Sequence, residues 1–580
     1  MVRNENSSSH SAAAQAWISR YAQPLSAGVA GPLAGLTFAA KDNIDALGLP
    51  TTAGCPDFAY QPTAHATVVH RLLQAGASLV GKTNLDQFAC GLNGTRSPYG
   101  AVPNALNPFY VSGGSSSGSA YVVATSQVDF ALGTDTAGSG RVPAGLNNIV
   151  GLKPSKGLIS THGVLPAAQS VDCVSILART VGVAVKVLQA AMGHDAQDPY
   201  SRHIPLASKP WAGAFRFGVP SQLEFFGDTL AQQAYAQAIE RLRSMGGTAV
   251  TIDYTPLAKA ADLLYESALV AERYAAIRPF FDTHEAAVIE PVRSIIAKGR
   301  AYSAADLCKA QAQLLAYGQQ AAPMWESTDL LLVPTAPTHY TIAQMQADPV
   351  ALNRNLGAYT NFVNLLDYAA LSVPSSLRAD GLPFGITFIG RCGSDLQLAE
   401  LGQRYHHASG LTQGATVWLL PATEPLAGLA MPPAPSAARP VATHLQIAVV
   451  GAHLSGMPLN GQLIERGASL VQATTTSAHY QLYALPNTTP PKPGLKRVGG
   501  AGAAIALEVW DVPLQHVGSF LALIPAPLGL GKVELMDGTW VTGFICEGHA
   551  LQDALDVSHF GGWRAYISSK ALVPQATVSQ

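Results

Sequence analysis

The fold is decided by one stretch of the chain, which reads Val128-Asp129-Phe130-Ala131-Leu132-Gly133-Thr134-Asp135-Thr136-Ala137-Gly138-Ser139-Gly140-Arg141-Val142-Pro143. It begins as an apolar run of strand length and continues into a glycine-rich turn, after which Pro143 is suited to open a helix. Ser139 stands between two glycines, so a substrate carbonyl has room to approach its hydroxyl. The backbone amides of Thr136, Ala137 and Gly138 are predicted to converge on a developing oxyanion. A turn serine with a purely structural hydrogen bond is the alternative for this stretch alone.

Residues 20–420 repeat this alternation of short apolar runs and helical spacing. Leu36–Ala40 and Leu330–Val333 are typical of strands, whereas Ala66–Gln74 and Gln232–Met245 have the spacing of helices. Such alternation favours an α/β domain built on a buried sheet. We therefore predict an α/β catalytic domain over residues 1–420.

A change of composition follows this domain. Six prolines stand among alanine and glycine between Pro421 and Pro440, which predicts an interdomain linker over residues 421–443. A new strand is expected from His444 to Val450, and residues 444–580 are long enough for a second, smaller domain with mixed α and β structure.

Composition excludes several classes of function. Hydrophobic residues make up 48% of the 580 residues and charged residues only 12%, and the net charge is −2. Without a basic block we expect no nucleic acid and no membrane partner, and no run approaches the ~18 apolar residues that span a bilayer. The segment Met1–Ala16 lacks the apolar core of a signal peptide, and six scattered cysteines suggest free thiols. We therefore expect a cytoplasmic protein. We expect no metal, because the histidines lack the spacing of metal ligands.

Two further stretches carry chemistry. The first is the block Gly113-Gly114-Ser115-Ser116-Ser117-Gly118-Ser119-Ala120, and the second is the run Leu36-Thr37-Phe38-Ala39-Ala40-Lys41-Asp42-Asn43. A flexible linker is the alternative for the first, but a helix-compatible segment follows the glycines at once. A solvated strand end is the alternative for Lys41, whereas a buried lysine loses its proton more readily and is then a base that activates a serine.

One competing motif is set aside. Gly76-Ala77-Ser78-Leu79-Val80-Gly81-Lys82-Thr83 fits the phosphate-binding pattern G-x-x-x-x-G-K-[ST]. A phosphate loop follows a strand, whereas here a helix is expected before Gly76 and Ala77–Val80 is itself the expected strand. Nucleotide binding is therefore not predicted at this position.

The three chemical stretches together resemble the amidase-signature family, in that family's order and spacing. The resemblance continues through Gly151-Leu152-Lys153-Pro154 and covers most of residues 20–420. It implies a mixed central sheet flanked by helices and a Ser-cisSer-Lys triad. In that triad Lys41 is the base, Ser115 the bridging serine after a cis peptide bond, and Ser139 the nucleophile. It implies no cofactor.

Finer features are similar to the allophanate hydrolases within that family. They are Asp86-Gln87-Phe88, Gly91, Gly94-Thr95-Arg96-Ser97-Pro98-Tyr99-Gly100, Ala137 and the segment from Tyr265 to Tyr274. The resemblance implies a small ureido carboxylate, allophanate, as substrate, held by Tyr265 and Arg273 with a backbone contact from Gly91. We expect Tyr265 and Arg273 on one side of a single helix. The alternative is that Arg273 merely pairs with Glu266 or Glu272 on the helix surface.

The tail shares this resemblance through Ile524-Pro525-Ala526-Pro527-Leu528-Gly529-Leu530-Gly531. Its strand and turn at Val449–Gly456 resemble γ-glutamylcyclotransferase-like domains, which makes His453 a candidate for decarboxylating N-carboxycarbamate, with Glu547 and His549 as weaker candidates. A tail that serves only assembly is the alternative. For the whole chain, the competing hypotheses are a broad small-amide amidase and a glutamyl-tRNA amidotransferase-like protein. We expect a homo-oligomer, namely a homodimer, linked in function to urea carboxylase in urea degradation.

Overall fold

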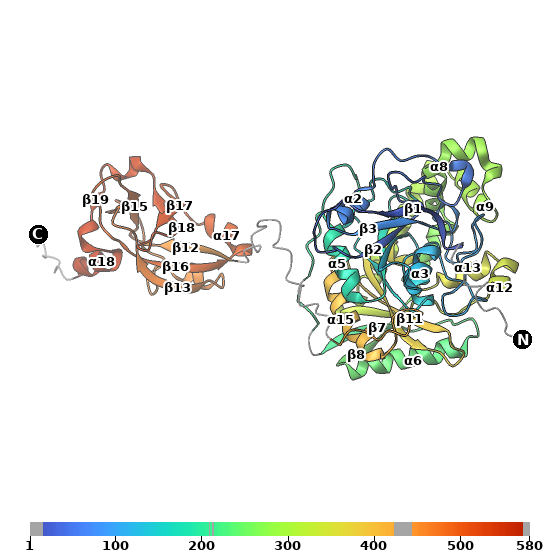
Figure 1. The fold of residues 1–580 in the computed structure, drawn as a ribbon. Helices are drawn as coiled ribbons and strands as arrows, with labels where there is room; N and C mark the ends of the chain where they lie inside the picture. The colour runs from blue at the N-terminus through green and yellow to red at the C-terminus, as the bar shows by residue number, and fades with distance from the viewer. Residues whose placement is uncertain (1–14, 208, 212–213, 423–443, 572–580) are drawn as a thin grey trace, which may run out of the picture. The chain divides into compact units, whose positions relative to one another are not determined.

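The structure, a computed structural model, describes residues 15–207, 209–211, 214–422 and 444–571 (Figure 1). The chain divides into two compact units, Met1–Pro432 and Pro433–Gln580. The linker predicted over 421–443 lies almost entirely outside the described residues, so it stays a prediction, as do the boundaries at 420 and 444. No helix within the described ranges is long and apolar enough to cross a bilayer.

The first unit is built on a mixed sheet, which has eleven strands within the described residues. In spatial order these are β1 (Trp17–Leu25), β3 (Ser78–Thr83), β2 (Thr37–Lys41), β4 (Phe130–Asp135), β6 (Cys173–Ala178), β5 (Val150–Lys153), β10 (Tyr368–Leu377), β11 (Pro383–Arg391), β9 (Leu330–Pro334), β7 (Phe215–Pro220) and β8 (Gly247–Ile252). Strand β2 pairs in parallel with β3 and β4, whereas β4 pairs antiparallel with β6. The predicted α/β class with a mixed sheet is confirmed.

Helices cover this sheet (Figure 1). They are α2 (Thr67–Gln74), α3 (Ser117–Ala124), α4 (Arg141–Leu146), α5 (Val181–Ala191), α6 (Thr229–Ser244), α7 (Thr255–Glu266), α8 (Ala271–His284), α9 (Val292–Ala297), α10 (Ala304–Ala321), α11 (Met324–Ser327), α12 (Ile342–Ala347), α13 (Ala351–Leu356), α14 (Phe362–Leu365) and α15 (Asp395–Ser409).

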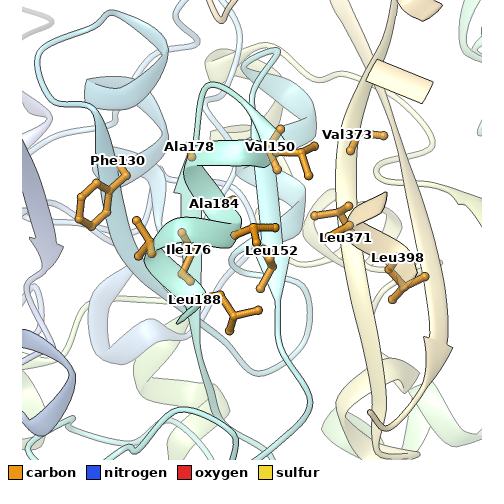
Figure 2. Packing of buried hydrophobic residues seen from close by; sticks show 14 of the residues in the cluster. Phe130, Val150, Leu152, Ile176, Ala178, Ala184, Leu188, Leu371, Val373 and Leu398 are labelled. Carbon is orange, nitrogen blue, oxygen red and sulfur yellow. The ribbon is translucent and has the colours of Figure 1, made fainter. Parts of the chain in front are cut away.

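The period of two along each strand explains why both faces of the sheet are buried. Phe130 and Leu132 of β4 join one hydrophobic cluster with residues of α2, α5 and α15, whereas Ala131 between them joins a second cluster with α3. Figure 2 shows the first of these layers, in which Ile176 and Leu152 lie near Leu188 of α5. Each large side chain buried in this way contributes about 1.5–3 kcal/mol to folding. The core thereby fixes the strand ends that carry the polar residues.

The segment that fits the phosphate-binding pattern forms no phosphate loop. Strand β3 contains Lys82, the position that such a motif would place after its loop, and α2 precedes the strand as expected. Lys82 is buried, with its Nζ 3.2 Å from Oδ1 of Asp42. Its charge is therefore already paired within the protein.

The second unit is a small α+β domain. Its larger sheet has the order β13 (Ser469–Thr475), β16 (Ala506–Pro513), β12 (His444–Val449), β18 (Trp540–Cys546) and β17 (Leu528–Glu534), and its smaller sheet the order β15 (Pro493–Arg497), β14 (Tyr480–Ala484) and β19 (Leu555–Asp556). Helices α16 (Gly461–Ile464), α17 (Leu514–Leu521) and α18 (Trp563–Ala571) complete it. The likeness to γ-glutamylcyclotransferase stays a prediction.

Candidate active site

Lys41 ends strand β2 inside the first unit and has no exposed surface. Its Nζ lies 2.7 Å from Oγ of Ser115 and 2.7 Å from Oγ1 of Thr134. No carboxylate among the described residues lies within ion-pair distance of it. Burial lowers the pKa of Lys41 to about 7, although the more distant charges of three aspartates act in the opposite direction. A substantial fraction of this amine is therefore neutral near pH 7.

Ser115 lies two residues before α3, and it links this lysine to residues 136–140, the loop that carries Ser139 and is called the nucleophile loop after its predicted role. The peptide bond between Gly114 and Ser115 is cis, as the family resemblance implies. The carbonyl of Ser115 accepts from the amide of Asp86 at 3.1 Å, and the amide of Ser116 donates to the carbonyl of Ser139 at 3.3 Å. A side chain at position 114 would collide with the carboxylate of Asp86, so only glycine fits there.

Ser139 lies in the turn between β4 and α4, where it is buried. Its Oγ donates to the carbonyl of Gly91 at 3.3 Å, which places Gly91 at the nucleophile. Among the hydrogen bonds of the described residues, none joins Oγ of Ser139 to Oγ of Ser115. The structure therefore brings Lys41 and Ser115 into contact, and a contact between the hydroxyls of Ser115 and Ser139 stays a prediction.

Asp135 shapes this turn from inside. Its carboxylate accepts from the amides of Gly138 and Gly140 at 2.9 and 3.1 Å and forms a fully buried bidentate pair with Arg141, at 2.9 Å for each contact. A charge-assisted pair of this geometry holds the loop firmly. Gly138 has φ of 133°, a region that L side chains rarely adopt, and this lets the chain turn into α4.

This network corrects one predicted member of the oxyanion hole. The amide of Gly138 is occupied by Asp135 and is not free for a substrate oxygen. The amides of Thr136, Ala137 and Ser139 donate to no acceptor within the described part of the chain. Thr136 and Ala137 therefore remain candidates, and Ser139 joins them.

Tyr265 and Arg273 do not share one helix as predicted. Tyr265 lies in α7 and Arg273 in α8, and the chain between them is extended at Ser267 before the 3₁₀ turn Ala268–Val270. The hydroxyl of Ser267 donates to the carbonyl of Leu263 and accepts from the amide of Leu269. Local bonds of this kind compete with the helix and explain the break.

The two side chains nevertheless meet. Nη2 of Arg273 donates to the hydroxyl of Tyr265 at 3.1 Å, and its guanidinium lies over the tyrosine ring. Arg273 is only 4% exposed, yet its Nε and Nη1 have no hydrogen-bond partner among the described residues. It forms no ion pair with Glu266 or Glu272 there, contrary to the surface alternative. Two buried guanidinium nitrogens are thus without a hydrogen-bond partner among the described residues.

A cavity of about 310 Å³ adjoins Tyr265. Its lining also includes Arg96 and Leu92, whereas Arg273 and Ser139 are not among its lining residues.

Sequence reasoning missed two buried carboxylates around the site. Asp86 accepts from the amides of three residues of the next loop, at 3.0–3.2 Å, and so holds that loop beside Ser115. Asp172 accepts from Oγ1 of Thr136 at 2.5 Å and from the amide of Ala167 at 2.7 Å, and burial raises its pKa to about 6. Asp86 belongs to a quoted motif, but nothing in the sequence around Asp172 distinguishes it from a surface aspartate.

The candidates in the second unit are placed differently. His453 is half-buried, with ring centroids of Phe520 and Phe544 each 5.2 Å away and its Nε2 2.9 Å from Oε1 of Gln462. Burial lowers its pKa. Oε2 of Glu547 lies 3.3 Å from Nδ1 of His549, and both side chains are exposed, which is typical of a solvated surface.

Comparisons with known proteins agree with this geometry. A model of the amidase family matches residues 4–399, and one of the allophanate hydrolase C-terminal domain matches residues 445–568. The solved allophanate hydrolase of Kluyveromyces lactis is 42% identical with a TM-score of 0.69, covering 96% of this chain and 94% of that one. A glutamyl-tRNA(Gln) amidotransferase chain of Thermotoga maritima is more distant, at 28% identity and a TM-score of 0.59, covering 69% of this chain and 87% of that one.

The urea amidolyase of Lachancea kluyveri is 45% identical over 553 residues, which are 92% of this chain and 30% of that protein. The chain thus spans about a third of the length of that relative. A buried lysine in contact with a serine, near a glycine-flanked serine, fits an amidohydrolase. The chain belongs to the amidase family, and an allophanate hydrolase C-terminal domain follows the amidase domain.

Proposed function

We propose that this chain is an allophanate hydrolase, which cleaves the terminal amide of allophanate and releases ammonia and N-carboxycarbamate. The observation that carries the substrate is Arg273, a buried guanidinium whose Nε and Nη1 have no partner within the described residues. Burying such a cation without a partner costs folding free energy, and an anionic ligand offsets that cost by accepting its hydrogen bonds. A planar carboxylate matches the geometry of the guanidinium. The urea amidolyase and allophanate hydrolase similarities support the same substrate.

The reaction follows from the contacts at Lys41. Neutral Lys41 takes the proton of the Ser115 hydroxyl while Ser115 takes that of Ser139, whose Oγ bonds to the amide carbon of the substrate. Free amides of the Thr136–Ser139 loop stabilise the oxyanion. The protonated lysine then returns its proton through Ser115 to the leaving nitrogen, the C–N bond breaks, and ammonia departs. Water attacks the acyl-enzyme by the same relay in reverse and releases the carboxylate product.

The wider setting belongs to the same proposal. N-Carboxycarbamate loses carbon dioxide in a later step, for which His453 is the candidate in the second unit. We further propose a cytoplasmic homo-oligomer that consumes the product of a urea carboxylase. Light scattering of the purified chain tests the oligomer, and a monomer at working concentration would remove that part.

Ammonia release from allophanate, biuret, malonamate and simple amides tests the reaction and its substrate. Allophanate should give the highest kcat/KM, and a neutral amide that matched it would refute the substrate assignment. Ser139→Ala should lower kcat by about a thousandfold or more, because the nucleophile is lost. Ser244→Ala, which changes an exposed serine at the end of α6, is the matched control and should leave kcat unchanged.

A further inference from the structure

A short segment of the first unit, residues 167–172 before β6, lies between the nucleophile loop and helix α8. At one end Asp172 binds the nucleophile loop, because Oδ1 accepts from Oγ1 of Thr136 at 2.5 Å. Its other oxygen accepts from the amide of Ala167 at 2.7 Å, so the carboxylate also closes its own segment into a compact turn. The side-chain amide of Asn364 donates to the carbonyls of both Asp135 and Val171, which fastens the same two loops a second time.

At the other end the segment binds α8 through Ser170. The amide of Ser170 donates to Oε2 of Glu272 at 2.9 Å, and its hydroxyl donates to Oε1 at 2.6 Å. Both oxygens of one half-buried carboxylate are thus bound to one residue. Glu272 forms no ion pair with any described residue, so its hydrogen bonds are directed wholly at Ser170.

Glu272 lies in the first turn of α8, directly before Arg273. Successive side chains on a helix point about 100° apart, so the turn that presents Glu272 to Ser170 presents Arg273 to a neighbouring face. On that face lies Tyr265, which takes one N–H of the guanidinium at 3.1 Å. Just before this turn the helical conformation is interrupted at Ser267, so α7 and α8 are not one continuous helix.

We infer that Ser170 and Glu272 are positioning residues that set the distance between the nucleophile loop and Arg273, and so determine the preference for carboxylate-bearing amides. The inference rests on the proposed function and deepens it, since it names residues that act on the substrate only through Arg273. Glu272 is thereby a specificity-determining residue even though it bears the same charge as the substrate.

The test uses a matched pair of substrates, malonamate and malonamide, which have the same carbon chain and differ in one carboxylate. Glu272→Gln keeps the size of the side chain but replaces one acceptor oxygen by an NH2 donor, so one of the two bonds from Ser170 is lost and the other no longer has a charged acceptor. We expect KM for malonamate to rise about tenfold, which corresponds to the weaker end of the range for one hydrogen bond to a charged group. The kcat for malonamide should change less than about twofold, because the nucleophile and relay are untouched.

Three further variants separate positioning from general damage. Ser170→Ala should give a smaller rise in KM for malonamate than Glu272→Gln does. Ser170→Thr keeps the hydroxyl, so its KM for malonamate should lie close to the wild-type value. The double variant Ser170→Ala/Glu272→Gln should be no worse than Glu272→Gln alone, since both changes remove one interaction. Glu240→Gln, which changes an exposed partner of Arg243 on α6, is the control and should leave both substrates unaffected.

Equal losses for malonamate and malonamide in Glu272→Gln would overturn the inference, as would additive losses in the double variant. The activity of the wild-type protein on the same substrates tests the proposed function separately. If it failed on allophanate but still preferred malonamate to malonamide, the allophanate assignment would be wrong and the role of Glu272 would still be measured. If it showed no preference between malonamate and malonamide, the inference itself would be wrong.

Discussion

Two lysines stand near the carboxyl ends of the neighbouring parallel strands β2 and β3, and both side chains are fully buried. Nζ of Lys82 lies 3.2 Å from the carboxylate of Asp42 and donates to Oγ1 of Thr51 at 3.0 Å. Among the residues that the structure describes, Nζ of Lys41 forms hydrogen bonds with the hydroxyls of Ser115 and Thr134 alone. Both lysine side chains are buried near the end of a strand. They differ in that the amine of Lys82 contacts a carboxylate and the amine of Lys41 does not.

That difference separates a structural lysine from a base. Burial lowers the pKa of both amines, but for Lys82 the charge of Asp42 opposes the effect directly. For Lys41 the opposing carboxylates are more distant, and its pKa falls to about 7. A buried lysine in contact with hydroxyls is thus available to accept a proton, whereas the amine of Lys82 is already paired with the carboxylate of Asp42, whose own pKa is raised by burial.

The largest expected effect is on Lys41. Lys41→Met keeps the length of the side chain and removes the amine, so Ser115 loses its proton acceptor. We expect kcat for the best amide substrate to fall about a thousandfold or more, with a circular dichroism spectrum and unfolding temperature close to those of the wild-type protein. Retention of a tenth of the wild-type kcat would show that the amine is not the base.

The second effect is on Lys82. Lys82→Met leaves the buried carboxylate of Asp42 unpaired, which should lower the free energy of unfolding by about 3–5 kcal/mol. Urea denaturation measures this directly. Asp42→Leu/Lys82→Met removes both charges and should recover much of the loss. If Lys82→Met were as stable as the wild-type protein, the ion pair would not be a structural cross-link and the contrast with Lys41 would fail.

The strands that carry these residues could be predicted, because their signal is local. The prediction of Leu36–Ala40 as a strand corresponds to β2, and Gln232–Met245 overlaps α6, where Asp228 accepts the amide of Ala231 as an N-cap. The single helix expected from Tyr265 to Arg273 failed at Ser267, since its local hydrogen bonds with Leu263 and Leu269 outweigh helical spacing.

The sequence predicted which residues form the site but not the hydrogen bonds that join them. The resemblance to the amidase-signature family indicated Lys41, Ser115 and Ser139, and their roles stay predictions for kinetics to test. The occupation of the Gly138 amide by Asp135 and the contact of Asp172 with Thr136 depend on segments that come together only in the folded sheet. No local pattern reports such pairings.

Arg273 is a buried cation like Lys41 and Lys82, and under the proposed function its counter-ion is the carboxylate of the substrate. Arg273→Ala should lower kcat/KM for allophanate by about two orders of magnitude, because the buried substrate carboxylate loses its partner. Malonamide should be affected much less, and Arg273→Lys should rescue poorly because it lacks the bidentate fork. Tyr265→Phe should cost less than Arg273→Ala. Equal losses on charged and neutral amides would remove Arg273 from substrate recognition.

The smallest effect is a displacement of the pH profile. Lys41 acts as a base only when neutral, and an amine is neutral above its pKa, so kcat/KM should rise with pH through about 7 and level off above it. The positive charge of Arg273 contributes to lowering the pKa of Lys41. Arg273→Ala should therefore move the half-maximal pH for malonamide upward, because the neutral amine becomes harder to form.

Lys82→Met is the matched control for that shift, measured at a temperature where the variant stays folded. Lys82 is not among the charges that act appreciably on Lys41, so its removal should leave the half-maximal pH where it is in the wild-type protein. A profile that stayed flat from pH 5 to pH 9 with chemistry shown to be rate-limiting would exclude a neutral-lysine base at Lys41. An unchanged midpoint in Arg273→Ala would instead leave the base in place and show that Arg273 acts on the substrate alone.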